Sequence, residues 1–379
     1  MASAEVKIGR MLEEVGCELN GSSPWDPQVH NPEALELILR GGTLAAGETY
    51  MDGMWDCQRL DMLSERMGGI GAPIKRLGYW AIARAALPGL LLNLQSPERA
   101  RQNAEHHYNI GNELYESMLG ETMAYSCAYF DSGARNLDEA QEAKFDLICR
   151  KLKLEPGMSL LDIGCGWGGL LSYVAKKYDI EAMGITPAGE QVQYIKEHGL
   201  DCEVRQQDWR EVEGLSFDRV VSVGMFEHVG QKNYRAYFQK VHELLTPGGL
   251  SLLHTIGAPR RRYTVDPFIH TYIFPGGRIP AASQIYNSSG ELFEVADFHD
   301  IGPNYDPTLM AWNENFQAAW PDLAGSLEPN GSTRYNERFK RMWEYYLLTC
   351  AGSFRNRTNR LFQFVMGDEN AVEGYEPVR

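Results

Sequence analysis

Short apolar runs alternate with amphipathic stretches along the second half of the chain. The runs predict strands because turn residues bound them, and the stretches predict helices because their apolar residues recur every three or four positions. We expect strands at Ser159–Ile163, Ile180–Ile185, Cys202–Gln206, Phe217–Val223 and Leu250–Thr255, and helices at Gly169–Tyr178, Ala188–His198 and Asn233–Leu245. This alternation predicts an α/β fold with a doubly wound, Rossmann-like parallel sheet.

The pattern differs toward both ends of the chain. Near the N-terminus, apolar residues recur at helical spacing between Val6 and Val15 and again after Pro32, and Gly41-Gly42 is expected to end the second helix. We predict a small helical domain over residues 1–92, a polar linker over 93–104 and a larger α/β domain over 105–379. The C-terminal part predicts a long helix at Asn336–Ser353 and antiparallel strands at the edge of the sheet.

A glycine-rich turn follows the first predicted strand. Between Asp162 and Gly169, glycines including Gly164 and Gly166 stand where the backbone must approach a cofactor closely. The spacing is Gly-x-Gly-x-Gly-Gly rather than the Gly-x-Gly-x-x-Gly of dinucleotide sites, and the second strand ends at Thr186-Pro187 without the acid that binds a ribose there. The turn therefore favours S-adenosylmethionine over a nicotinamide or flavin dinucleotide, with Asp162 ordering the turn or reaching the amino-acid end.

Polar residues also follow the later strands. Asp208-Trp209 offers a carboxylate and an aromatic face for an adenine after the third strand, and Glu227 and His254 follow the fourth and fifth. Ligands of such sheets bind outside the carboxyl ends of the strands. Because two ionisable residues end adjacent strands beside a cofactor turn, we expect them to be functional rather than structural.

Composition narrows the choice of partner. A formal net charge of -15 argues against nucleic acid, which Lys and Arg must neutralise. The seven cysteines include no Cys-x-x-Cys pair, so neither a metal site nor a disulfide framework is predicted.

The N-terminus carries no apolar signal core, which predicts a cytoplasmic protein. The apolar stretch Trp80–Leu94 is too short to span a bilayer and predicts a helix that lies on a membrane, packs between domains or forms a dimer.

Five longer motifs stand out along the chain: YSCAY (125–129), LLDIGCGWGGL (160–170), VSVGMFEHVG (221–230), LLHTIG (252–257) and TLMAW (308–312). They closely resemble motifs of the bacterial cyclopropane-fatty-acyl-phospholipid synthases, relatives of the mycolic acid cyclopropane synthases. Matching stretches also occur at 47–57, 93–96, 337–347 and 350–355, so the resemblance covers nearly the whole chain. It implies an S-adenosylmethionine-dependent methyltransferase whose catalytic domain is 105–379.

The resemblance implies a specific reaction. Members transfer a methyl group from S-adenosylmethionine to the cis double bond of a phospholipid acyl chain, and a base then deprotonates the resulting carbocation so that a cyclopropane ring closes. The base of the family is a bound bicarbonate, and its implied ligands here are Cys127, Glu227, His254, the backbone of Ile256, and Tyr305. Tyr108, Tyr272, Phe274 and Trp312 are candidate aromatic walls around the carbocation.

The resemblance also distributes the cofactor over the predicted pocket. It implies that the amino-acid end lies near Tyr125, Ser126 and Gly164, the ribose near Thr186 and Gln191, and the adenine near Asp208 and Trp209. Pro187-Ala188-Gly189 departs from the family, whose members usually carry a small apolar residue and a serine after the threonine. The implied partners are a phospholipid bilayer and a second copy of the chain in a homodimer. The bilayer would be contacted at its cytoplasmic surface through the N-terminal domain or through the Arg-rich loops, which are Arg260–Arg262 and the cluster Arg355, Arg357 and Arg360.

Three alternatives remain open from the residues. A C-methyltransferase on the same scaffold would leave a methyl-branched or hydroxylated acyl chain, but it is expected to lack part of the bicarbonate set. A small-molecule N-methyltransferase would share the fold and some of the motifs. A lipid-binding protein without activity would not require both the cofactor turn and the base ligands.

Overall fold

The computed structural model describes residues 3–68, 110–200, 202–262, 265–327 and 333–379, and the chain divides into two compact units. The first unit combines Met1–Leu92 with Tyr263–Pro275 and Tyr305–Asn359. The second unit combines Asn93–Arg262 with Gly276–Asn304 and Arg360–Arg379. The chain therefore passes between the units several times, and each unit is described separately.

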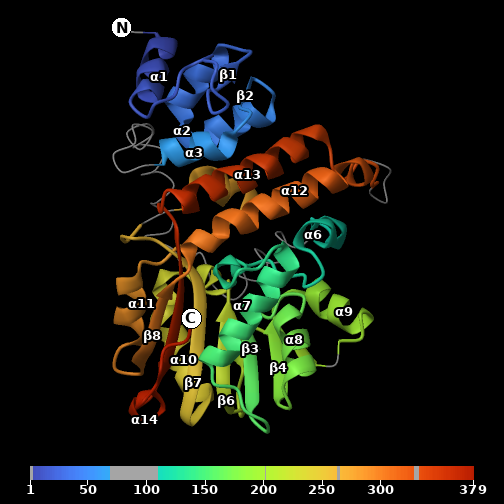
Figure 1. Ribbon diagram of the computed structural model, residues 1–379, viewed down its shortest axis with the longest axis vertical. Helices are drawn as coiled ribbons and strands as arrows, with labels where there is room; N and C mark the ends of the chain where they lie inside the picture. Colours follow the sequence, from blue (N-terminus) through green and yellow to red (C-terminus); the bar gives the residue numbers. More distant parts are fainter. Residues whose placement is uncertain (1–2, 69–109, 201, 263–264, 328–332) are drawn as a thin grey trace. The chain divides into compact units, whose positions relative to one another are not determined.

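A mixed seven-stranded sheet forms the centre of the second unit, in the order β5-β4-β3-β6-β7-β9-β8 (Figure 1). Its strands are β3 (Ser159–Ile163), β4 (Glu181–Thr186), β5 (Glu203–Gln206), β6 (Phe217–Val223), β7 (Leu245–Gly257), β8 (Glu294–Asp300) and β9 (Arg360–Gly367). The first five run parallel, and β9 pairs antiparallel with both β7 and β8. The predicted doubly wound α/β fold and its antiparallel edge are confirmed.

Helices pack on both faces of this sheet because neighbouring strand residues point to opposite sides. The helices of this unit are α6 (Asn112–Leu119), α7 (Leu137–Lys151), α8 (Gly169–Lys177), α9 (Gly189–Glu197), α10 (Tyr234–Leu244), α11 (Ala282–Ser289) and α14 (Glu369–Val372). Leu160 and Val221 pack with residues of α7 and α8, whereas their neighbours Leu161 and Val220 pack with residues of α10 and α11. The two layers of core hold the carboxyl ends of the strands in a fixed arrangement.

One predicted strand boundary differs from the structure. Strand β7 begins at Leu245 rather than Leu250, and its pairing with β6 shifts register between Phe217 and Arg219. Helix α2 (Glu33–Met51) consists of two helical segments that meet at Gly42, so the predicted helix end at Gly41-Gly42 coincides with a break in the helical backbone. The chain kinks there because Gly42 has φ 64° and ψ -138°, and the helix then resumes.

The first unit is mainly helical. Its helices are α1 (Ala4–Glu13), α2, α3 (Leu60–Met67), α12 (Tyr305–Leu323), α13 (Glu337–Arg355) and a π-helical turn at Ile269–Ile273, and its two short strands are β1 (Gln28–Val29) and β2 (Trp55–Asp56). Asn336 caps α13 by accepting a hydrogen bond from the backbone N–H of Phe339, which explains where the predicted long helix begins. The segments 263–275 and 305–359, predicted as parts of the α/β domain, cluster with the N-terminal residues instead.

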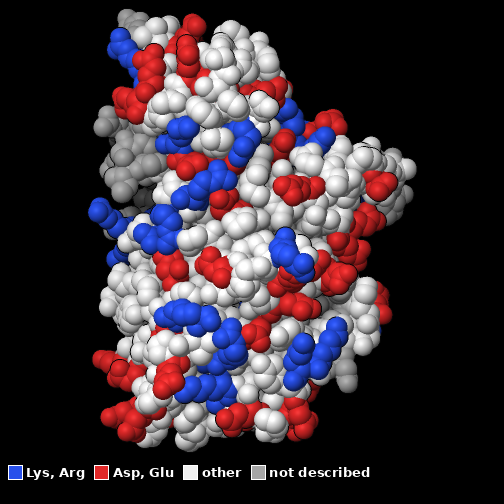
Figure 2. Space-filling model, in the orientation of Figure 1, with Lys and Arg blue, Asp and Glu red and all other residues white. Residues whose placement is uncertain are grey.

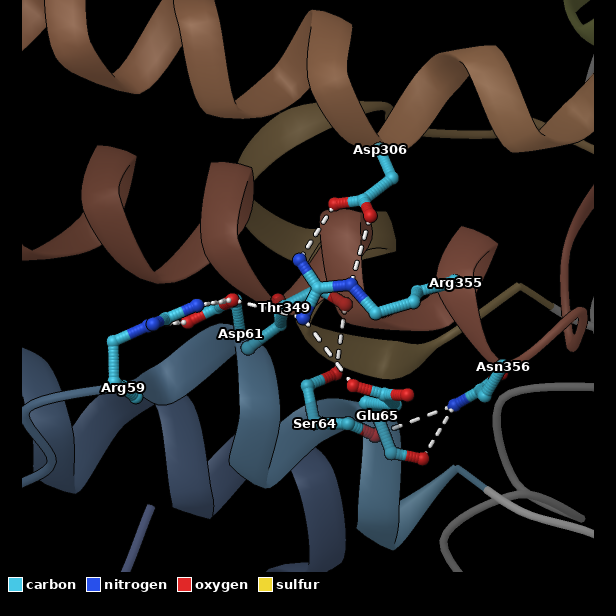
Figure 3. Close-up of polar contacts among 8 residues, drawn as sticks. All are labelled: Arg59, Asp61, Ser64, Glu65, Asp306, Thr349, Arg355 and Asn356. Atoms are coloured by element: carbon cyan, nitrogen blue, oxygen red, sulfur yellow. Dashed lines mark hydrogen bonds and ion pairs between the residues drawn. The ribbon is translucent and has the colours of Figure 1, made fainter. Parts of the chain in front are cut away.

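A buried ion network joins three helices of this unit (Figure 3). Arg355 of α13 forms two hydrogen bonds of 2.7 Å with Asp306 of α12, and it also contacts Asp61 of α3 at 2.9 Å. Asp61, whose side chain is almost fully buried, receives a second ion pair from Arg59 at 2.8 Å. Since one guanidinium serves two helices, Arg355 fixes the start of α12 relative to α3.

Candidate active site

The glycine turn between β3 and α8 has the close-approach geometry that its sequence predicts. The backbone N–H groups of Gly164 and Cys165 both donate to the carbonyl of Ile185, at 2.9 and 3.1 Å. Gly164 has φ +86°, and a Cβ placed on it would lie 2.6 Å from Cβ of Met225. Only glycine fits there, because an L side chain would be strained and would collide with Met225.

A pocket opens over this turn at the carboxyl ends of β3, β4 and β6. All of the residues predicted to bind the cofactor line it: Tyr125, Ser126, Asp162, Gly164, Gly166, Thr186, Gln191, Asp208 and Trp209. They come from loops and strand ends that are far apart in sequence. The structure brings the set together, and the contact of each with a cofactor stays a prediction.

Two buried polar atoms in this pocket lack a partner among the residues that the structure describes: Oδ1 of Asp162 and Nε2 of Gln191. The Gln191 side chain is oriented by Thr186, whose hydroxyl donates to its Oε1 at 2.7 Å. Burial raises the pKa of Asp162 to about 7, and the positive charge of Lys144 opposes that rise. Unpaired buried polar atoms are costly, so these two are suited to a polar ligand.

Asp208 and Trp209 form one rim of the pocket. The Asp208 carboxylate accepts from the backbone N–H of Arg210 at 2.9 Å and pairs with its guanidinium at 3.0 Å. That guanidinium lies 4.7 Å from the centre of the Trp209 ring, which is buried against Tyr237. Arg210, which the motif analysis did not single out, therefore holds both predicted adenine contacts in place.

The pocket also contains a buried lysine that the motif analysis missed. Lys144 lines it from α7, is fully buried, and donates from Nζ to Ser126 Oγ at 2.8 Å and to Gln141 Oε1 at 2.6 Å. One signal was present in the sequence: Leu137, Gln141, Lys144, Ile148 and Lys151 form a stripe at helical spacing. Polar residues on such a core-facing stripe need partners inside the protein.

Glu227, another predicted site residue, lies next to the pocket and contacts the backbone of Ile256. Glu227 lies in a 3-10 turn (Phe226–His228) after β6, between the pocket-lining residues Met225 and His228. Its Oε1 accepts a 2.6 Å hydrogen bond from the backbone N–H of Ile256, whereas Oε2 is buried with no partner within the described residues. Burial raises the pKa of Glu227 to about 7, and the Ile256 N–H opposes the rise.

His254 is fully buried on β7, two residues before Ile256. Its Nδ1 lies 3.2 Å from Nε2 of Gln363 on β9, the residue opposite it in the antiparallel ladder. Its Nε2 is buried and has no partner in the described part of the chain. Burial, and then the charges of Lys144 and Lys151, keep the pKa of His254 well below its ordinary value, so the ring is neutral.

The sequence matches one known family over most of its length. Residues 95–364 match the model of the family described as mycolic acid cyclopropane synthetase. The chain belongs to the cyclopropane synthase family. It is 46% identical over 366 residues to the cyclopropane-fatty-acyl-phospholipid synthase of Escherichia coli strain K12, which covers 96% of this chain and 93% of that protein.

Solved structures agree with this family assignment. The cyclopropane synthase MmaA2 from Mycobacterium tuberculosis is 30% identical, with a TM-score of 0.65 over 73% of this chain and 99% of that one. The mycolic acid cyclopropane synthase CmaA1, solved with SAH and CTAB, is 32% identical, with a TM-score of 0.62 over 70% of this chain and 97% of that one. A coclaurine N-methyltransferase reaches a TM-score of 0.72 over 86% of this chain and 99% of that one, but at 22% identity it shows a shared fold alone.

The remaining site residues expected of a cyclopropane synthase divide between the units. Cys127 is buried in the second unit, where it interacts electrostatically with Lys144, and its thiol lies 3.2 Å from the carbonyl of Ala128. Tyr305 belongs to the first unit, where it opens α12 and its ring packs 4.4 Å from that of Phe354. The Ile256 N–H, implied as a ligand of bicarbonate, is engaged by Glu227 in this structure.

The aromatic residues predicted to surround a carbocation pack within the first unit, as far as the structure describes them. Trp312 packs edge-on against Tyr305, and Phe274 lies 6.1 Å from Tyr346 between ring centres. The hydroxyl of Tyr272 donates to Glu48 at 2.9 Å. All three belong to the first unit, and Tyr108 lies outside the described residues. Their role toward a substrate stays a prediction.

Proposed function

We propose that this protein transfers a methylene group from S-adenosylmethionine to the cis double bond of unsaturated phospholipid acyl chains and closes a cyclopropane ring. The chain is an S-adenosylmethionine-dependent enzyme of a lipid-modifying family. The phospholipid substrate is proposed from the activity for which its Escherichia coli relative is named, and this chain matches that relative over nearly its full length.

The pocket over the glycine turn fits S-adenosylmethionine. The carboxyl of Asp162 suits the ammonium group of the amino-acid end, and the free N–H of Gln191 suits a ribose hydroxyl. The Trp209 ring provides a flat apolar face for the adenine. When bound, the cofactor supplies an electrophilic methyl group, and the Gly164 backbone leaves room for its approach.

One observation supports a bicarbonate site most directly: Glu227 Oε2 and His254 Nε2 are both buried without partners among the described residues, and Glu227 accepts a hydrogen bond from Ile256, two residues after His254 on the same strand. Because Gln363 donates to Nδ1 of His254, the neutral ring carries its proton on Nε2 and offers a donor there. Glu227 offers an acceptor. A donor and an acceptor match an ion that has both a charged oxygen and a hydroxyl group.

These residues would orient and shield a base. Bound bicarbonate supplies the group that takes a proton from the transferred methyl. His254 would hold one of its oxygens, and Glu227 would accept its hydroxyl hydrogen and so fix its direction. The Ile256 N–H holds Glu227 in place, so Ile256 acts on the site through that carboxylate. Cys127 and Tyr305 complete the proposed set of ligands.

The partner and location are also proposals. We infer that the protein acts at the cytoplasmic surface of a phospholipid bilayer and as a homodimer, with the N-terminal domain or the Arg-rich loops in contact with lipid. No helix among the described residues is long and apolar enough to cross a membrane. On the face shown in Figure 2, basic and acidic side chains are interspersed. This mixture suits reversible contact with a surface rather than strong binding to a polyanion.

An isotope experiment tests the reaction. The full-length protein is incubated with vesicles of a cis-monounsaturated phosphatidylethanolamine and S-adenosylmethionine that carries a trideuteromethyl group, and the acyl chains are analysed by mass spectrometry. Ring closure removes one deuteron, so a cyclopropane product keeps two. A methyl-branched or hydroxylated product keeps three and would assign the chain to C-methyltransferases, and label absent from the acyl chains would reject both lipid activities.

A further inference from the structure

Lys144 is a buried cation of the second unit that the proposed chemistry does not use. Its side chain is fully buried, yet it lines the cofactor pocket. The hydrogen-bond partners that the described residues give its Nζ are the neutral side chains of Ser126 and Gln141. Burial of the ammonium group is costly and lowers the pKa of Lys144 to about 7, and the charges of Cys127 and Asp162 oppose that fall only in part. A ligand with a negative charge would remove that cost.

Lys144 and its neighbour Gln141 both form hydrogen bonds with one loop of the pocket, which contains Ala124 and Ser126. Gln141 accepts from Lys144 and donates to the carbonyls of Ala124 at 3.2 Å and Ser126 at 2.9 Å. The Ser126 hydroxyl accepts from Lys144, so its own hydrogen is left to donate elsewhere. Two side chains of α7 therefore fix both the backbone and the hydroxyl of the loop that carries Ser126.

The pocket lining contains one other Lys or Arg residue, Arg210, and it does not compete for an anion in the same way. Arg210 lines the pocket too, but its guanidinium already pairs with Asp208 at 3.0 Å. Asp162 lies in the same pocket and carries the free Oδ1 described above. The pocket thus combines a lysine with neutral partners and a carboxyl with a free oxygen, which is the charge pattern of a zwitterionic amino acid.

We propose that Lys144 is a positioning residue that recognises the carboxylate of the cofactor's amino-acid end through Ser126. The ammonium group aims the Ser126 hydroxyl into the pocket as a donor and places a positive charge behind it. The carboxylate is the only anionic group of S-adenosylmethionine, so Lys144 distinguishes the intact cofactor from analogues that lack it. This inference rests on the cofactor part of the proposed function and is independent of the lipid and of bicarbonate.

The test compares two ligands on one protein by isothermal titration calorimetry of the full chain without lipid. The ligands are S-adenosylmethionine and its decarboxylated form, which keeps the sulfonium and the amine. In the wild type we expect tighter binding of the carboxylate-bearing ligand. Lys144→Met should weaken the binding of S-adenosylmethionine by about tenfold to hundredfold, the loss expected when the hydrogen bond from Ser126 to the carboxylate is disrupted. It should change the binding of the decarboxylated ligand by less than about twofold.

Lys151→Met is the matched control. Lys151 is equally buried on the same helix, but it pairs with Asp297 at 2.8 Å and does not line the pocket. Its replacement should lower the melting temperature and leave the preference between the two ligands as in the wild type. Ser126→Ala, which keeps the lysine, should also reduce the preference for the carboxylate-bearing ligand. If circular dichroism shows that Lys144→Met does not fold, the preference measured in Ser126→Ala tests the proposal instead.

Each outcome is decisive. A wild type that binds both ligands equally, or a Lys144→Met variant that weakens both to the same extent, would overturn the role of Lys144 in carboxylate recognition. An unchanged preference in a folded Lys144→Met, or in Ser126→Ala where that variant decides, would overturn it as well. A wild type that binds neither ligand would instead reject the cofactor assignment of the proposed function.

Discussion

His254 and Gln363 stand directly opposite each other on β7 and β9, and their side chains meet, with Nδ1 of His254 3.2 Å from Nε2 of Gln363. Both residues are fully buried. With the Gln363 amide in this orientation its Nε2 donates to Nδ1, and we predict that His254 carries its proton on Nε2, because a ring nitrogen that accepts cannot also hold a hydrogen. Gln363 thereby turns Nε2 of His254 into the donor that the proposed anion site needs.

We predict that Gln363→Leu loosens this control. The Nε2–H tautomer of His254 should lose population, and the rate of ring formation should fall about two- to tenfold, as expected for one neutral hydrogen bond. The tautomer is measured by nitrogen-15 NMR of histidine-labelled protein, with His254→Gln to assign the signal. Val365→Ala, a cavity on the same strand, is the control and should leave the tautomer unchanged. An Nδ1–H tautomer in the wild type would contradict the assignment.

Glu227→Gln should separate catalysis from cofactor binding. The variant should lose most ring formation while still binding S-adenosylmethionine, because the proposed acceptor is gone but the cofactor pocket remains. Product analysis by mass spectrometry and calorimetric titration of the cofactor measure the two effects. Ring formation at the wild-type rate would reject the proposed base site.

The same substitution has a pH signature. The folded pKa of Glu227 is raised to about 7, so the folded state binds this proton more tightly than the unfolded chain does. The wild type should therefore lose stability relative to Glu227→Gln as the pH rises from 4.5 to about 7, by about 3 kcal/mol. Urea unfolding of both proteins at pH 5 and pH 8 measures this. Asp162 is unchanged in both proteins, so its titration cancels, and an equal difference at both pH values would argue against a buried Glu227 that titrates near neutrality.

Gly164→Ala should abolish cofactor binding. The new Cβ would lie 2.6 Å from Cβ of Met225, in a residue with φ +86°. Gly157→Ala is a matched control, because Gly157 has φ +83° but no atom within 4 Å of the position of a Cβ. Both variants should lose about 1–2 kcal/mol to backbone strain, and only Gly164→Ala should also lose titratable binding of S-adenosylhomocysteine. Equal binding by both variants would show that the close contact with Met225 is unimportant.

Arg355→Met should destabilise the first unit. It removes the ion pairs to Asp306, Asp61 and Glu65, and Asp61, which is 1% exposed, then keeps Arg59 as its one ion-pair partner among the described residues. Loss of one partner from a largely buried pair costs about 3 kcal/mol, measured as the free energy of unfolding in urea. Arg338→Met on the same helix is the control, since its pair with Asp52 is about half exposed on both sides and should contribute less than about 1 kcal/mol. Similar losses in the two variants would contradict the importance of the buried network.

The sequence predicted the sheet well because its signals are local. The alternation of apolar and polar residues located β3, β4, β5 and β6 within a residue or so, and Asn336 marked the start of α13. It also marked Gly41-Gly42, where the non-helical backbone of Gly42 divides α2 into two segments. Pattern alone could not show that residues 263–275 and 305–359 cluster with the N-terminal segment, because that grouping depends on contacts between distant parts of the chain.

For the site, the residues from Asp162 to Gly169, with Asp208-Trp209 and the pair Glu227 and His254, were enough by themselves to predict a cofactor pocket and a neighbouring polar centre. Their residue types and their positions at strand ends indicate this chemistry without any knowledge of the folded structure. Only the tertiary structure decided which polar atoms are left unpaired, and it added Lys144, Arg210 and Gln363. These residues lie far from the motifs in sequence or on a helix stripe, and their roles arise from burial and hydrogen bonding, which exist only once the chain has folded.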